Sequence, residues 1–187
     1  MRKKKKAVFW VFVSVAVFSF MVTGCASLGI SPAPKATQAV AVLRPTQGSN
    51  ASGKIVFIQE GNKVRIVADV TGLTPGKHGI HIHEFGDCTT PDGMGAGGHF
   101  NPHNKPHGGP DDDERHLGDL GNLDADKTGR AKYDRLDDRI SLTGRNSIIG
   151  RSVVIKERAD DFTTQPGGNA GARVACGVIG VASSPME

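Results

Sequence analysis

Aromatic residues are scarce in this sequence of 187 residues and make up 5% of it. The only tryptophan, Trp10, and four of the eight phenylalanines lie within the first 24 residues. The rest of the chain must therefore build its core mainly from valine, isoleucine, leucine and alanine. Beyond residue 24 the apolar residues also show no sustained helical period, which argues against a helical fold.

Clustered positive charge is missing as well, outside residues 2–6. The formal net charge of the whole chain is +4, and removing the five basic residues at that end leaves −1. The remaining lysines and arginines are scattered and form no stripe of the kind that binds a phosphate backbone. The composition therefore excludes nucleic acid as the expected partner.

The N-terminal sequence "MRKKKKAVFWVFVSVAVFSFMVTGCAS" has the features of an export signal. Its apolar run, residues 7–22, has 16 residues, fewer than the roughly 20 that cross a bilayer as a helix. An uncleaved membrane anchor is the alternative. The letters "VTGC" resemble the cleavage site of bacterial lipoproteins, in which the cysteine becomes the lipid-bearing first residue. This resemblance implies a signal peptide at residues 1–24 and a lipid on Cys25 that attaches the protein to the outer side of the bacterial cell membrane. The composition of the following segment, with "SPAPKATQ", predicts a tether at residues 25–38.

Short runs rich in β-branched residues follow, separated by turn sequences such as "EGN", "TPGK" and "DKTG". This pattern predicts an all-β sandwich or barrel that forms one domain, residues 39–187. The expected strands are residues 38–43, 53–59, 63–70, 79–84, 131–136, 147–157 and 173–182. Two longer segments interrupt the short turns, at residues 85–130 and 158–172. Irregular segments of this length in a compact domain are commonly functional, so we expect a ligand to organise them.

The three cysteines add a constraint, because an exported protein works where disulfides persist. With Cys25 carrying the lipid, Cys88 and Cys176 remain. If paired, they would close a loop of about 88 residues and stabilise the fold by roughly 4 kcal/mol on loop-entropy grounds. Two separate buried thiols are the alternative, and the oxidising compartment favours the pair.

Histidines gather in the middle of the chain. In "GIHIHE", residues 79–84, a strand would place His81 and His83 on one face and the two isoleucines on the other. The following long segment contains His103 and a further set that can surround one ion: His99, His107, His116 and Asp119. Three imidazoles and one carboxylate suit tetrahedral zinc. A solvated loop without an ion is the alternative, and the two strand histidines just before the loop weaken it.

Four stretches together resemble the copper/zinc superoxide dismutase family. They are "GIHIHEFGDC", "GGHFNPHNKPHGGPDDDERHLGDLGN", "SIIGR" and "GNAGARVACGVIG", and the likeness covers nearly all of residues 39–183. These motifs are long, ordered and highly specific, so a chance match is negligible. The resemblance implies a Greek-key β-barrel with two long functional loops, bound copper and zinc, and a disulfide between Cys88 and Cys176. It also implies the disproportionation of superoxide to hydrogen peroxide and oxygen.

The resemblance further assigns roles to individual residues. The copper set that it implies is His81, His83 and His99, and the zinc set is His99, His107, His116 and Asp119, with His99 as the bridge. Asp160 corresponds to the carboxylate that ties a copper histidine to a zinc histidine, here His81 to His107. Arg173 corresponds to the arginine that guides superoxide to the metal. His78 and His103 match no ligand position, and we expect them to be ordinary polar residues.

One position departs from the family pattern. A fourth copper histidine is expected on the strand after "SIIGR", but this chain reads "SVVIKER", with Lys156 in its place. Three histidines still suit Cu(II), with lower affinity and a shifted potential. A protonated lysine would repel copper, whereas burial and a nearby cation can lower its pKa from about 10.4 far enough for a neutral amine to bind the metal. A side chain that points into solvent is the third alternative.

Three classes of function follow. The first is a superoxide dismutase outside the cytoplasm, with zinc bound and copper in an incomplete site; superoxide is its substrate and a homodimer is a compatible assembly. The second is a catalytically silent, zinc-bound relative that binds copper or zinc at the cell surface. The third is a structural module in which zinc only holds the long loop. Arg173, Asp160 and the sequence "GNAGAR" favour the first class, and Lys156 favours the second.

Overall fold

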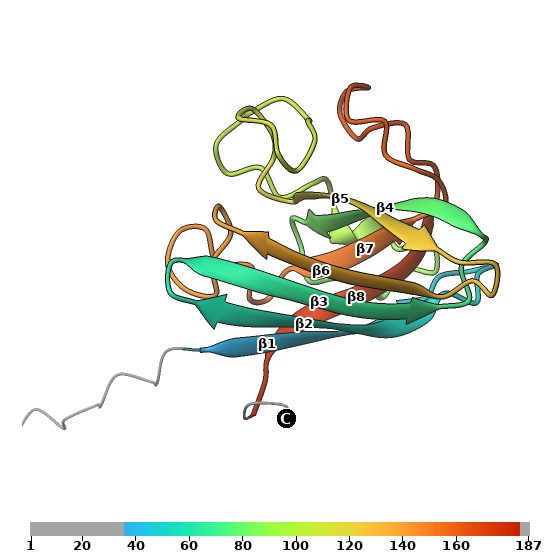
Figure 1. The fold of residues 1–187 in the computed structure, drawn as a ribbon, viewed down its shortest axis with the longest axis horizontal. Helices are drawn as coiled ribbons and strands as arrows, with labels where there is room; N and C mark the ends of the chain where they lie inside the picture. Colours follow the sequence, from blue (N-terminus) through green and yellow to red (C-terminus); the bar gives the residue numbers. More distant parts are fainter. Residues whose placement is uncertain (1–35, 184–187) are drawn as a thin grey trace, which may run out of the picture. The chain divides into compact units, whose positions relative to one another are not determined.

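The structure, a computed structural model, describes residues 36–183 as a closed antiparallel β-barrel (Figure 1). Its strands are β1 (Gln38–Pro45), β2 (Ser52–Glu60), β3 (Lys63–Thr71), β4 (Gly76–His83), β5 (Asp119–Ala125), β6 (Ala131–Asp137), β7 (Ser152–Lys156) and β8 (Arg173–Val181). Around the barrel they follow the order β1-β2-β3-β6-β5-β4-β7-β8, which confirms the predicted all-β, Greek-key class. The predicted signal peptide, Cys25 and nearly all of the tether lie outside the described residues. Within the described range, no helix is long and apolar enough to span a membrane.

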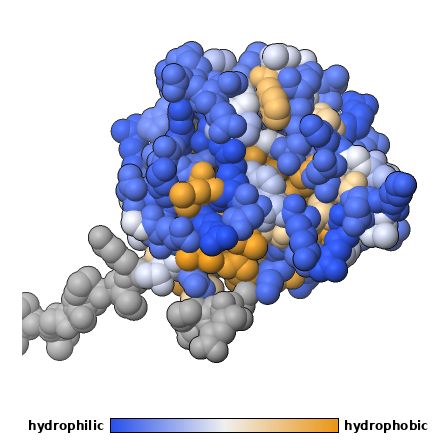
Figure 2. All heavy atoms as spheres, in the orientation of Figure 1, coloured by the Kyte–Doolittle hydropathy of each residue, from blue (hydrophilic) through white to orange (hydrophobic). Residues whose placement is uncertain are grey.

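Alternating burial along the strands forms the core. Ile55 and Phe57 of β2 and Ile66 of β3 are fully buried inside the barrel, while the residues between them are more exposed. Ile80 and Ile82 of β4 join the same core, as a period of two predicts. The outer face seen in Figure 2 is mostly hydrophilic. The barrel is thus apolar inside, and the outward side of β4 is left for its histidines.

The segment predicted as one long loop, residues 85–130, contains a strand, β5. Its sequence "DLGNLDA" includes glycine, asparagine and aspartate, which are depleted in strands, so its apolar alternation is too weak to indicate one. Pairing with β4 stabilises it over most of its length. The strand expected at residues 147–157 is also shorter, because only Ser152–Lys156 pair as β7.

Two long loops rise on the same side of the barrel, above β4 and β5 (Figure 1). The first loop, residues 84–118, joins β4 to β5 and contains one short 3-10 helix, η1 (Met94–Ala96). The second loop, residues 157–172, joins β7 to β8. A disulfide between Cys88 and Cys176 ties the first loop to β8 and confirms the predicted pair, with 5.7 Å between the two Cα atoms.

Reduction of this disulfide should weaken the fold. The bond joins residues 88 apart, and constraining the unfolded chain over such a distance is worth roughly 4 kcal/mol. We therefore expect the thermal midpoint of the oxidised protein to fall by roughly 10 °C on reduction. A Cys25→Ser variant keeps the pair and, as the control, should respond to reductant in the same way. Two free thiols in the mass spectrum of the non-reduced protein would contradict the pairing.

Candidate metal centre

Strand β4 presents His81 and His83 on the side opposite the core, and both rings are buried. Their centroids lie 6.4 Å apart. A register shift between Gly79 and His81 interrupts the pairing with β5, and irregularities of this kind re-aim side chains. A Cβ atom at Gly79 would lie 2.9 Å from Cε1 of His81, so glycine leaves room for this ring. The strand thus holds two imidazoles close together beneath the loops.

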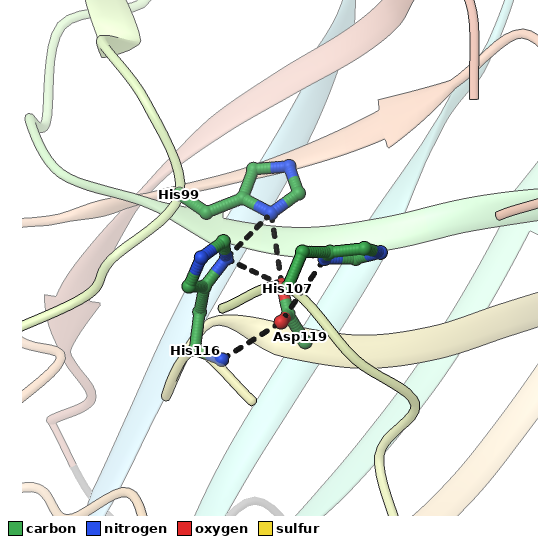
Figure 3. Close-up of side chains that lie close together, drawn as sticks. All are labelled: His99, His107, His116 and Asp119. Carbon is green, nitrogen blue, oxygen red and sulfur yellow. Dashed lines mark hydrogen bonds and ion pairs between the residues drawn. The ribbon is translucent and has the colours of Figure 1, made fainter. Parts of the chain in front are cut away.

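Four side chains converge at the start of β5: His99, His107, His116 and Asp119 (Figure 3). Nδ1 of His99 lies 2.8 Å from Oδ1 of Asp119, and Nδ1 of His116 lies 3.2 Å from the same atom. Nδ1 of His107 lies 3.1 Å from the other oxygen, Oδ2, but makes no hydrogen bond to any described residue. One donor atom from each of the four lies within 4.8 Å of the others. The residues predicted to bind zinc are therefore gathered around one point.

The charges in this group favour a cation. Backbone N–H groups of Gly108 and His116 donate to Oδ2 of Asp119 at 3.2 and 2.8 Å. Burial alone would raise the pKa of Asp119, but its contacts with the three histidines lower that pKa well below the usual range. Burial opposes a charge on His107, yet Asp119 and Asp160 raise the pKa of this imidazole to about 9. A positive charge is thus stabilised between two carboxylates, which fits a zinc ion with these donors.

A second group shares His99 with the first and adds His81 and His83. Nδ1 of His81 and Nε2 of His83 are buried and make no hydrogen bond to any described residue. Buried nitrogens without a partner are costly, and so they are rare. Burial is the main reason why the pKa of all three imidazoles is lowered, that of His99 to about 3. The neutral form therefore dominates at neutral pH, and neutral imidazole is the form that binds a metal such as copper.

Asp160 links the two groups. Its Oδ2 lies 2.7 Å from Nε2 of His81, and its Oδ1 lies 2.9 Å from Nε2 of His107. These contacts leave Nδ1 of each ring as the nitrogen available to a metal. Asn122 of β5 holds Asp160 in turn: its Oδ1 accepts from the backbone N–H of Asp160 at 2.7 Å and its Nδ2 donates to the carbonyl at 3.0 Å. Sequence reasoning missed Asn122, although the residue stands inside the motif "GDLGN".

Lys156 ends β7 and lies opposite Arg173 of β8 at a second register shift. Its side chain is half-buried, and its amine makes no hydrogen bond or ion pair with any residue in the range 36–183. Burial and the charge of Arg173 lower the pKa of Lys156 to about 8, against an opposing effect of Asp160. The charge of Lys156 adds to the effect of burial in lowering the pKa of each histidine of the second group. The lysine therefore acts on these imidazoles instead of extending fully into solvent.

Arg173 is fixed by carbonyl oxygens of the first loop. Its Nη1 donates to the carbonyl of Gly93 and its Nη2 to the carbonyl of Gly97, each at 2.6 Å. The Gly97 carbonyl also lies 2.9 Å from Nδ1 of His83. One backbone group thus orients the arginine and a histidine of the second group. Sequence reasoning missed Gly97, because every residue has a carbonyl and no residue type marks this role.

The turn that carries His116 and Asp119 is supported by a buried ion pair. Nη2 of Arg115 donates to Oδ2 of Asp137 at 2.6 Å, and both side chains are almost fully buried. Nη1 of the same arginine donates to the carbonyls of His116, Leu117 and Asp119 at 3.1, 3.3 and 3.1 Å. Removing one partner of such a pair typically costs about 3–5 kcal/mol. The first loop is therefore shaped by the barrel as well as by its own histidines.

The two remaining histidines of the described residues lie outside both groups. His78 is buried, with Nδ1 2.8 Å from the carbonyl of Lys156 and Nε2 2.8 Å from the carbonyl of Thr74. His103 is exposed, and its Nε2 lies 3.2 Å from Oδ1 of Asn146. Both residues therefore have protein partners of their own, as expected for ordinary polar residues.

Comparison with known proteins identifies one family that the chain resembles. The family model for copper/zinc superoxide dismutase matches residues 51–179. The extracellular Cu-Zn superoxide dismutase of Brugia pahangi is 46% identical over 158 residues, which cover 80% of this chain and 78% of that protein. The Cu-Zn superoxide dismutase of Onchocerca volvulus is 47% identical over 159 residues, or 79% of this chain and 98% of that protein. Among solved structures, the crystal structure of the clock protein EA4 has a TM-score of 0.73 and 45% identity, over 79% of this chain and 96% of that chain.

Replacing Asp119 by asparagine should release zinc. The change removes the charge that the three imidazoles surround, so we expect zinc affinity to fall by more than the roughly 10- to 100-fold typical of residues that only orient a ligand. The barrel should stay folded, because β5 pairs with β4 through its backbone. Elemental analysis after dialysis measures the zinc, and proteolysis within residues 84–118 reports loosening of the first loop. Asp134→Asn, at an exposed carboxylate bonded to Arg65, is the control. Unchanged zinc content in Asp119→Asn would rule out the assignment.

Proposed function

The chain belongs to the copper/zinc superoxide dismutase family, and we propose that it disproportionates superoxide outside the cytoplasm at a site for copper and zinc. The observation that carries this proposal is the pair of converging groups that share His99 and are linked through Asp160. A module that needed zinc only to hold its loop would require neither the second group of buried imidazoles nor the charge of Arg173 acting on His83. The disulfide and the extracellular relative support a position outside the cytoplasm.

We assign zinc to the first group of four residues and copper to the second group of three. Bound copper supplies the one-electron exchange with superoxide, cycling between its two oxidation states. Arg173, fixed by two carbonyls, keeps a positive charge near His83 that attracts the superoxide anion. His99 presents Nδ1 to the zinc group, which leaves Nε2 as the ring atom that can hold or release a proton on the copper side.

Lys156 supports a second candidate function, a zinc-bound relative that handles copper or zinc at the cell surface without turnover. Its charge acts on the same three imidazoles that we assign to copper. A protonated amine at this position opposes Cu(II), whereas a neutral amine completes a set of four nitrogen donors. With its pKa at about 8, the protonated form predominates at pH 7. We therefore propose that the dismutase activity is weak and that Lys156 limits it.

We further propose that a lipid on Cys25 anchors the protein to the outer side of a bacterial membrane. The support is the sequence "VTGC" after a basic and then an apolar stretch, all of which lies outside the described residues.

A homodimer is the assembly that we propose. Its support is the apolar surface that Val42, Val178 and Val181 expose on the neighbouring strands β1 and β8.

Lys156→His should restore copper chemistry. The charge of Lys156 acts on all three imidazoles of the second group, which supports a position beside them, and an imidazole there would complete four histidines. We expect tighter copper binding and a rise in dismutase activity of at least about tenfold, which corresponds to only about 1.4 kcal/mol in the barrier. Copper titration and superoxide decay measure the two effects. A histidine variant that binds copper no better than the natural chain would show that Lys156 does not limit the site.

Lys156→Ala separates the two roles of the lysine. If the protonated amine repels copper, alanine should strengthen copper binding at pH 7. That gain should shrink above pH 8, where the lysine loses its charge. If the neutral amine is a ligand, alanine should instead weaken binding, most clearly at pH 9. Identical copper affinities for lysine and alanine at both pH values would exclude both roles.

Cys25→Ser should release the protein from the membrane fraction, because the lipid is attached through this cysteine alone. Fractionation of the producing cells measures the release, and mass spectrometry of the natural protein should show a lipidated first residue at Cys25. The released form is suited to sedimentation velocity, in which a homodimer should appear at twice the monomer mass. An unmodified Cys25 in the mass spectrum of the natural protein would refute the lipid anchor.

A further inference from the structure

The second loop holds His107 by its backbone as well as by its ring. Oε1 of Gln165 accepts from the backbone N–H of His107 at 2.8 Å, and Nε2 of Gln165 donates to the carbonyl of His107 at 2.9 Å. Because the two residues are 58 apart in the sequence, these bonds join the first and second loops directly. Asp160 of the same loop contacts the ring. The second loop therefore forms hydrogen bonds with both the backbone and the side chain of this histidine.

The glycines that follow Gln165 bring the segment close to the metal centre. A Cβ atom at Gly167 would lie 3.5 Å from Nε2 of His99. At Gly168, where φ is +68°, a Cβ atom would collide with the carboxylate bonded to His107 and lie 2.7 Å from Nε2 of that ring. Glycine permits both this approach and this backbone conformation. The sequence "QPGG" thus brings the amide of Gln165 and the backbone of Gly168 close to His107.

We propose that Gln165 is a positioning residue for zinc, which locks His107 in its ligating orientation before the metal arrives. This inference rests on the zinc site proposed above. The amide satisfies the N–H and the carbonyl of one residue, a two-point contact that fixes how His107 sits in the loop. With the ring also held through Nε2, its Nδ1 stays beside Asp119. An ordered ligand loses less conformational freedom on binding, and zinc affinity rises accordingly.

A second amide side chain makes the same kind of two-bond contact with the backbone of a residue at the metal centre. Asn122 makes two bonds with the backbone of Asp160, as Gln165 does with the backbone of His107. An amide side chain therefore steadies each of these two neighbouring residues. Gln165 itself is exposed and lies outside the barrel core, so its side chain can be removed without disturbing the strands.

The test measures the zinc affinity of the oxidised, metal-free protein by competition with a chromophoric chelator. We expect Gln165→Ala to bind zinc about 10- to 100-fold more weakly than the natural chain, the range typical of residues that orient a ligand. Gln165→Glu keeps the acceptor for the His107 N–H and loses the donor to its carbonyl, so its affinity should lie between the two. Thr163→Ala, at an exposed residue of the same loop, is the matched control and should bind zinc as the natural chain does.

Hydrogen exchange separates positioning from general stability. In the metal-free protein the His107 amide should exchange faster in Gln165→Ala than in Thr163→Ala, while amides of the barrel strands exchange at equal rates in both. Equal zinc affinity in these two variants would overturn the inference and leave the zinc site standing. Failure of the natural chain to bind zinc would instead overturn the zinc site, and the inference with it.

Discussion

The buried carboxylate of Asp119 is the constraint on which the metal centre depends. A charge without solvent exposure is costly unless it is bonded, and here three imidazoles and two backbone N–H groups surround it. All of these groups come from the first loop, so folding of β5 onto β4 gathers that loop around one point. The Arg115–Asp137 pair and the disulfide hold the same loop from the barrel side. The geometry of the proposed zinc site is therefore set largely by contacts within the protein itself.

The two metal groups differ in what surrounds the metal positions. The zinc group has four donors and contacts with two carboxylates, which favour a cation. The group that we assign to copper has three imidazoles whose pKa is lowered, and Lys156 stands where the resemblance to the family implies a fourth donor. The pairing of β7 with β8 fixes the backbone at position 156. The side chain of Lys156 lies against β4, because a Cβ atom added at Gly79 would be 3.3 Å from its Cγ. The departure from the family pattern that we propose therefore lies in the chemistry of one side chain, at a backbone position fixed by strand pairing.

Much of the fold was predictable because seven of the strands alternate apolar and polar residues or carry β-branched runs. β5 was not, because Gly121 and Asn122 interrupt its apolar pattern, and the strand depends on pairing with β4. The candidate metal-binding residues could be predicted because they stand in two short histidine-containing motifs, "GIHIHE" and the segment from His99 to Asp119. The two amide contacts, from Asn122 and Gln165, had no such signal. An amide near a turn is common in any sequence, and only the folded chain shows which backbone it meets.

We propose that one barrel holds a complete zinc group beside a copper group that lacks one donor. The most direct measurement is superoxide decay by the zinc-loaded protein before and after one equivalent of copper is added, with both metals quantified. We expect about one zinc ion per chain to survive dialysis, and bound copper to accelerate the decay of superoxide only weakly. A protein that retains no zinc, or whose superoxide decay is the same with and without bound copper, would contradict it.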